Sequence, residues 1–180
     1  MKDAAIILTS GMFNSRNAKT AFGLVRHSEK YRILAVIDHN FYGLDAGEIV
    51  TGKNLNIPIY ASIKVFLREQ KSKQNIAEEK LARGLHAIIG VATSGGVIPD
   101  VLREELFEAL SHGMHIVNGL HHYLSDDIEL IRTAEKSKSE LIDIRKPKQA
   151  KEHAFWTGEI RNVRAPRIAM FGTDCAIGKR

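Results

Sequence analysis

Short, unbroken runs of aliphatic residues alternate along this chain with segments of helical periodicity. The runs consist of Ile, Val, Leu and Ala, and they lack a polar residue at every second position. Strands that are covered on both faces have this composition, and parallel sheets are the usual case. At 180 residues the chain can form one α/β domain and a remainder. We therefore predict an α/β fold with a mostly parallel sheet and helices on both faces.

The individual elements follow from this alternation. Candidate strands lie at residues 4–9, 33–37, 87–91, 114–117, 141–144 and 168–171. A further short strand is possible at 57–60, where Pro58, which cannot donate a ladder hydrogen bond, limits it to an edge or entry position. Candidate helices lie at 17–27 with Asn17 as N-cap, at 62–83, at 99–112, and from Ser125 or Asp126 onward.

Periodicity disappears near Arg145 and returns only at Arg167. The intervening segment carries prolines and many charges, which is typical of a linker. We predict a first domain at 1–145, a linker at 146–166, and the first strand and loop of a second, truncated α/β domain at 167–180.

The basic residues are unevenly distributed. The formal net charge is +5, yet residues 1–144 contain 17 Lys and Arg against 18 Asp and Glu, whereas residues 145–180 contain 9 against 3. A local basic stretch beside a phosphate-binding motif fits a small anionic ligand at least as well as nucleic acid. We expect a small-molecule substrate and no nucleic-acid partner.

Two further observations bear on location. No apolar run approaches the roughly 20 residues that a membrane helix needs, and the chain begins with a strand rather than a signal peptide. The single cysteine, Cys175, cannot form an internal disulfide, which fits a reducing compartment. We expect a cytoplasmic protein with no membrane partner.

The last residues combine a strand with a glycine-rich loop that ends in lysine. The loop begins with Gly172, Thr173 and Asp174 and closes with Gly178 and Lys179. In a phosphate-binding loop (P-loop), backbone N–H groups surround a phosphate and the lysine reaches its outer oxygens. Five residues separate the glycines where the common form has four, as in the similar loop of dethiobiotin-synthetase-type enzymes. The alternative is a strand and turn with an incidental Gly-Lys pair.

The end of the chain interrupts this motif. A helix N-terminus normally follows a phosphate loop and forms part of the site. Arg180 stands where the metal-binding Ser or Thr is usual, and it is the last residue. We therefore expect the chain to be a fragment that binds nucleotide poorly on its own.

A second candidate site follows the first two predicted strands. Gly11 lies in the turn after the first strand, Lys19 and Thr20 begin the next helix, and Asp38 ends the second strand. An anion bound beside Lys19 would offset the unfavourable lysine at the positive helix end, and Asp38 could accept a hydrogen bond from a ribose. A solvated lysine and a capping aspartate are the alternative.

Two more loops follow strands. Gly95 and Gly96 come after the strand at 87–91 and would let a backbone approach a ligand closely, although a plain turn is the alternative. His121 follows the strand at 114–117, and imidazole is the natural general base near neutral pH. Zinc is disfavoured, because the clustered histidines belong to different elements and no cysteine is near, so we predict no metal site.

Four segments of the chain, taken together, resemble the D-glutamate N-acetyltransferase-like family, long a family of unknown function. They are NAKTAFGLVR from Asn17, GVATSGGVIP from Gly90, GLHHYLSDD from Gly119 and GTDCAIGKR from Gly172. The resemblance covers essentially the whole chain in order. It implies a Rossmann-like N-terminal domain followed by a larger P-loop domain.

The resemblance also implies a reaction, the transfer of acetyl from acetyl-CoA to the amine of a D-amino acid such as D-glutamate. The phosphate loop then falls on Gly172, Thr173, Asp174, Gly178 and Lys179. Lys179 and His121 become the candidate catalytic residues, with His121 as the base that deprotonates the amine. Acetyl-CoA is the expected cosubstrate, ATP and Mg²⁺ are further candidates, and a homo-oligomer is expected.

Two other function classes stay open. A P-loop ATPase, kinase or ligase would use the same loop and Lys179 without acetyl-CoA. A non-catalytic small-molecule-binding domain would use Lys19, Gly95 and Gly96 to hold a ligand.

Overall fold

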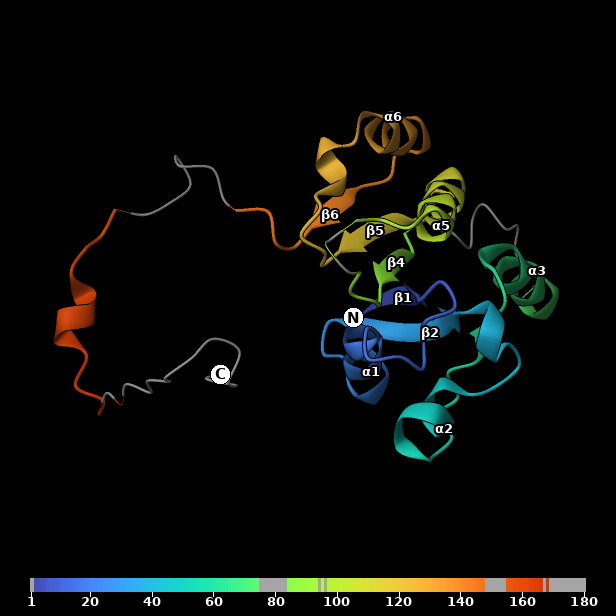
Figure 1. Ribbon diagram of the computed structural model, residues 1–180, viewed down its shortest axis with the longest axis horizontal. Helices are drawn as coiled ribbons and strands as arrows, with labels where there is room; N and C mark the ends of the chain where they lie inside the picture. Colours follow the sequence, from blue (N-terminus) through green and yellow to red (C-terminus); the bar gives the residue numbers. More distant parts are fainter. Residues whose placement is uncertain are drawn as a thin grey trace. The chain divides into compact units, whose positions relative to one another are not determined.

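The computed structural model describes residues 2–74, 84–93, 95, 97–147, 155–166 and 168. The chain divides into two compact units, Met1–Lys146 and Pro147–Arg180. The first unit contains the sheet and its helices (Figure 1). In the second unit the described residues include one 3-10 turn, η5 (Glu159–Asn162), where the Arg161 guanidinium lies 5.1 Å from the centre of the Trp156 ring.

The first unit is built on a six-stranded sheet in which every neighbouring pair of strands is parallel. The strands are β1 (Asp3–Leu8), β2 (Tyr31–Ile37), β3 (Ile59–Tyr60), β4 (His86–Ile89), β5 (His115–Asn118) and β6 (Leu141–Asp143). Their order is β3-β2-β1-β4-β5-β6, and the neighbours β2, β1, β4, β5 and β6 are labelled in Figure 1. The order reverses between β1 and β4, as in Rossmann-like folds, so the predicted α/β class is confirmed. As expected, β3 follows Pro58 at an edge.

Helices connect the strands. They are α1 (Lys19–Arg26), α2 (Ala46–Thr51), α3 (Ile63–Gln74), α5 (Asp100–Ser111) and α6 (Ile128–Ser137), with 3-10 turns η1 (His39–Phe41) and η3 (Leu124–Asp126). From β1 the two halves of the sheet progress in opposite directions, so right-handed crossovers put α1 and α2 on one face and α5 and α6 on the other. The contacts follow this division, since α1 packs on α2 and α5 packs on α6.

The start of α1 differs from the prediction. Ala18, not Asn17, is the N-cap, and no side chain caps this helix. Instead, the end of β4 holds the helix start: Ala21 N–H donates to the Gly90 carbonyl at 2.9 Å, and Ala92 N–H donates to the Asn17 carbonyl at 2.8 Å. The close approach depends on Gly90, because a Cβ atom there would lie 2.4 Å from Cγ2 of Ile7.

Helix α2 is absent from the sequence prediction because its six residues are too few to show a periodicity. Its N-cap, Asp45, organises the segment around it: one carboxylate oxygen accepts from the N–H groups of Glu48 and Leu55, and the other accepts from Ile57 N–H at 2.7 Å. Two other predicted elements, the second half of the helix at 62–83 and the strand at 168–171, lie almost entirely outside the described residues.

Candidate functional site

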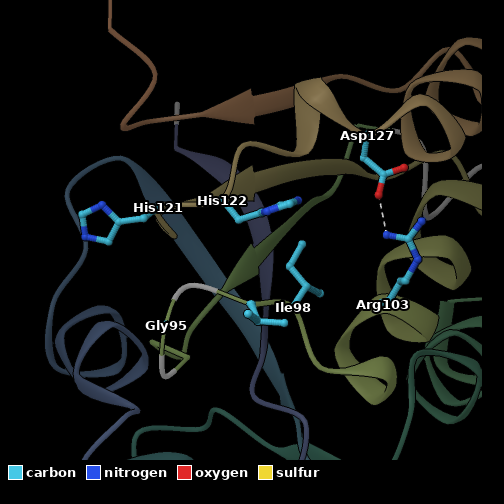
Figure 2. Close-up of a pocket in the computed structure, with 7 residues that line it drawn as sticks. Gly95, Ile98, Arg103, His121, His122 and Asp127 are labelled. Atoms are coloured by element: carbon cyan, nitrogen blue, oxygen red, sulfur yellow. Dashed lines mark hydrogen bonds and ion pairs between the residues drawn. The ribbon is translucent and has the colours of Figure 1, made fainter.

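A pocket of about 440 Å³ lies beyond the carboxyl ends of β4 and β5 (Figure 2). Ligands of open α/β sheets bind at this edge of the sheet, and the volume is that of a small-molecule site. Three segments form the walls: the loop after β4, the first turns of α5, and the loop from β5 to α6. The lining residues are Gly95, Val97, Ile98, Arg103, His121, His122 and Asp127.

Asn118 holds the loop that carries the two histidines. Its side chain is fully buried at the end of β5. The amide nitrogen Nδ2 donates to the His122 carbonyl and to Oδ1 of Asp143, both at 2.7 Å, while Oδ1 accepts from Leu120 N–H at 2.9 Å. Because a buried amide with all three partners resists displacement, the backbone of residues 118–122 has a defined position.

Asp143 on β6 anchors the next part of the same loop. Its two carboxylate oxygens accept from the N–H groups of Leu124 and Ser125 at 3.0 and 2.9 Å. Burial raises the pKa of Asp143, but the hydrogen bonds from Ser125 and Asn118 outweigh it and hold this pKa below its ordinary value. Residues Leu124–Asp126 therefore form a tight 3-10 turn, and α6 begins after Asp127 rather than at Ser125 or Asp126.

An ion-pair network closes one end of the pocket. Arg103 on α5 donates through Nη1 to Oδ2 of Asp127 and through Nη2 to Oε2 of Glu129, the second at 2.7 Å. Oδ1 of Asp127 caps α6 by accepting from Glu129 N–H and Leu130 N–H. The hydrogen bond from Arg103 lowers the pKa of Asp127, and the two carboxylates raise the pKa of Arg103. The two carboxylates and the one guanidinium of this network sum to a net charge of −1.

The two histidines face different ways. Both are exposed, and both line the pocket. Figure 2 shows the His122 ring directed toward the Arg103–Asp127 pair, above Ile98, whereas the His121 ring is directed to the opposite side. The structure thus brings two sequence candidates, His121 and Gly95, to one pocket, and it adds His122 as the imidazole beside the charged groups.

Asp38 has a different task from the expected ribose contact. The side chain is fully buried. Oδ2 accepts from Oγ1 of Thr9 at 2.7 Å and from Phe13 N–H at 3.0 Å, and Oδ1 accepts from Asn40 N–H at 3.0 Å. A ribose hydroxyl cannot reach a carboxylate that is enclosed in this way, so the ribose assignment is corrected. Asp38 caps η1 and fixes the loop after β1.

The other candidates near the first helix do not line the pocket. Lys19 and Thr20 are exposed in the first turn of α1. Gly11 has φ +80°, and a Cβ atom there would lie 2.6 Å from Cε1 of His39. Its carbonyl accepts from Nδ2 of Asn40 at 2.9 Å. Gly11 therefore serves the packing of the loop after β1 against η1.

The sequence did not predict the hydrogen-bonded pair Ser10 and Glu105, which lies beside the end of β1. Ser10 follows β1 with φ +50°, and its hydroxyl donates to Oε2 of Glu105 on α5 at 2.7 Å. Burial raises the pKa of Glu105 to about 7, against the lowering effect of Ser10 and with help from Asp38 and Glu108. The sequence signal for Glu105 was only its place near a helix start, which favours any acidic residue.

Two features are missing from the described part of the chain. There, no helix combines the length and apolar character of a membrane span. Within the same residues, no three His, Cys, Asp or Glu side chains are grouped closely enough to hold a metal ion. Gly96 and the whole phosphate-loop candidate, Gly172, Thr173, Asp174, Gly178 and Lys179, lie outside the described residues.

Two curated relatives carry the same descriptive name. A protein of Pseudoalteromonas sp named D-glutamate N-acetyltransferase is 38% identical over 92 residues, which make up 51% of this chain and 26% of the relative. A protein of Tritonibacter scottomollicae with that name is 33% identical over 108 residues, 60% of this chain and 31% of the relative. The matched segments span only about a quarter to a third of the length of these relatives.

The structure and the sequence point to the same family. A crystal structure of a DUF1611 family protein from Anabaena variabilis superposes with a TM-score of 0.65 at 33% sequence identity, covering 82% of this chain and 38% of that one. Residues 40–147 match the family described as a domain of unknown function, DUF1611_N, a Rossmann-like domain. Because more than half of its residues match this family and its parallel sheet has a Rossmann-like strand order, the chain belongs to the DUF1611_N family.

Proposed function

We propose that the complete protein transfers an acetyl group from acetyl-CoA to the amine of a D-amino acid such as D-glutamate. The observation that carries this proposal is the similarity to two relatives named D-glutamate N-acetyltransferase, at 38% and 33% identity. The pocket supports it, since it places two imidazoles at the carboxyl edge of a Rossmann-like sheet. Imidazole is a general base suited to neutral pH.

The reaction needs a deprotonated amine. An ammonium ion loses one proton to a base, the free nitrogen lone pair forms a C–N bond to the thioester carbonyl, and the C–S bond breaks. The nitrogen then loses a second proton to become the amide, and the sulfur, which leaves as a thiolate, takes up one proton and is released as free CoA. The two pocket imidazoles, His121 and His122, are the candidate bases, and the loop from Gly172 to Lys179 is the candidate site for the CoA pyrophosphate.

A second function has one observation in its favour. The Gly172–Lys179 spacing resembles loops that bind nucleoside triphosphates. In that case the complete protein is an ATPase, kinase or ligase, and ATP with Mg²⁺ replaces acetyl-CoA.

One assay separates these two functions. The complete protein is incubated with acetyl-CoA and D-glutamate, L-glutamate or no acceptor, with and without Mg-ATP, and thiol release is followed. Thiol release that depends on D-glutamate supports the acetyltransferase. ATP consumption without thiol release contradicts it and supports the nucleotide enzyme.

A further inference from the structure

We infer that the pocket beyond β4 and β5 binds the ammonium end of the acceptor between Asp127 and His122, and that His122 is the imidazole that takes its proton. This inference rests on the proposed acetyl transfer for its substrate class. It goes further by assigning the pocket to the amine rather than to the carboxylates or to CoA phosphates, and by selecting His122 over His121.

The charge of the ion-pair network beside the pocket favours a cation. Arg103 and Asp127 line the pocket, and the exposed Glu129, which is not among the lining residues, shares the same guanidinium, so the three groups of the network sum to −1. An anionic ligand would meet a guanidinium that two carboxylates already compensate. An ammonium would instead gain from the excess negative charge, because opposite charges attract strongly where water is partly excluded.

Asp127 has the geometry to receive an ammonium N–H. Its Oδ1 accepts from two backbone N–H groups of α6, whereas Oδ2 accepts from Arg103. A carboxylate has about four lone-pair sites, so Oδ2 retains acceptor capacity. The side chain is 15% exposed and lines the pocket, so part of this carboxyl side chain is accessible to a ligand.

His122 completes the amine site. Its backbone carbonyl is held by Asn118 at 2.7 Å, and its ring is directed toward Asp127 (Figure 2). A ring nitrogen lone pair can accept one proton from the ammonium: that N–H bond breaks, its electron pair stays on the amine nitrogen, and the imidazole becomes an imidazolium. The negative excess at Asp127 and Glu129 then stabilises the imidazolium. Val97 and Ile98 provide an apolar wall for the carbon chain of the acceptor.

The first test is a binding comparison on the 180-residue chain. D-Glutamate and glutarate carry the same two carboxylates, but glutarate lacks the amine. Each is titrated while the ring resonances of His121 and His122 and the Gly95 amide are followed by NMR. We expect D-glutamate to shift His122 and Gly95 with at least about tenfold higher affinity than glutarate, as expected for a site whose polar groups need the missing donor.

Matched variants sharpen the comparison. Both histidines are exposed, so H122A and H121A leave the fold intact. H122A should reduce the affinity for D-glutamate to that for glutarate, whereas H121A should leave it within about twofold. E129Q removes negative charge beside Arg103 and should lower the preference for D-glutamate over glutarate about threefold. The control E135Q makes the same charge change on α6 away from the pocket and should leave that preference unchanged.

Several outcomes overturn the inference. Equal binding of glutarate and D-glutamate would show that the pocket selects carboxylates through Arg103. A stronger effect of H121A than of H122A, or the absence of any shift at His122 and Gly95 up to about 50 mM ligand, would place the amine elsewhere. The thiol-release assay separates this failure from failure of the proposed function, since D-glutamate-dependent release with full activity of H122A contradicts only the amine-site assignment.

Discussion

The loop after β1 and the loop after β5 leave the same edge of one sheet, yet they differ in what their polar residues do. On the β1 side, Ser10 after β1 and Asp38 at the end of β2 are occupied by partners within the protein, and a Cβ atom on Gly11 would lie 2.6 Å from His39. After β5, Asn118 and Asp143 likewise hold the backbone, but the next side chains border an open pocket. Position at the carboxyl edge is therefore insufficient for a site, because packing decides which loop leaves room for a ligand.

The largest expected effect comes from replacing Asp38, because its carboxylate holds the loop after β1 through Phe13 N–H. D38A leaves the N–H groups of Phe13 and Asn40 without their acceptor and removes one of the two acceptors of the Thr9 hydroxyl, the other being the Ile37 carbonyl at 2.9 Å. We expect a loss of about 3–5 kcal/mol in the free energy of unfolding, because buried donors lose their partners. Urea denaturation measures it, and D38N, which keeps the shape and one oxygen, should lose less. A loss below about 1 kcal/mol for D38A would show that Asp38 does not hold the loop after β1.

Two glycine substitutions compare a tightly packed position, Gly90, with an open one, Gly119. In G90A the new Cβ would lie 2.4 Å from Ile7 and 2.9 Å from Ala21, whereas at Gly119 nothing lies within 4 Å. We expect G90A to lower the free energy of unfolding by about 1–3 kcal/mol through overpacking, and G119A to change it by less than about 0.5 kcal/mol. Thermal or urea unfolding measures both. Equal losses would show that Gly90, which follows β4, and Gly119, which follows β5, are equally packed.

The raised pKa of Glu105 predicts that the free energy of unfolding depends on pH. Its pKa is raised from 4.5 to about 7, chiefly by burial, so the folded state binds the proton more tightly than the unfolded state. This contribution to stability is complete below about pH 4.5 and is lost as the pH rises through about 7. E105Q should therefore be more stable than the wild type by roughly 1–3 kcal/mol at pH 8, with the difference shrinking toward pH 5. Unfolding curves of both proteins across this range give the difference, and a constant difference would contradict the raised pKa.

A small effect is also expected at the open pocket, where Arg103 on α5 pairs with Asp127 and Glu129 beside α6. R103M keeps much of the packing on Phe107 and removes both ion pairs. We expect a loss of about 1 kcal/mol or less that diminishes in high salt, because the guanidinium is partly solvated. Unfolding at low and high ionic strength measures it. A loss that does not depend on salt would show that packing, rather than charge, joins the two helices.

Sequence patterns predicted the strands well and the helix starts less well. The aliphatic runs identified every strand of the described sheet, including the edge strand after Pro58, because burial on both faces demands continuous apolar residues. Asn17 has the residue type of an N-cap, but tertiary contacts at Gly90 hold the start of α1 instead. Six residues were too few to predict α2.

The candidate site was predicted in part. His121 and Gly95 were singled out because they follow predicted strands, and both line the pocket. Arg103 was not singled out, because an arginine on a helix is usually an ordinary exposed residue. Only the packing of α5 on α6 pairs it with Asp127 and Glu129. Asp38 had the right position for a ligand contact, but its burial was invisible in the sequence.

By itself, then, the sequence determined the succession of strands along the chain, the helices other than α2, and which loops reach the carboxyl edge of the sheet. These properties depend on local periodicity and on the apolar character of short segments. Tertiary structure decided which polar groups are enclosed, as at Asp38 and Glu105, and which border a cavity, as at His122 and Asp127. The physical reason is that burial and hydrogen-bond partners arise between elements far apart in the chain, whereas sequence patterns report each element separately.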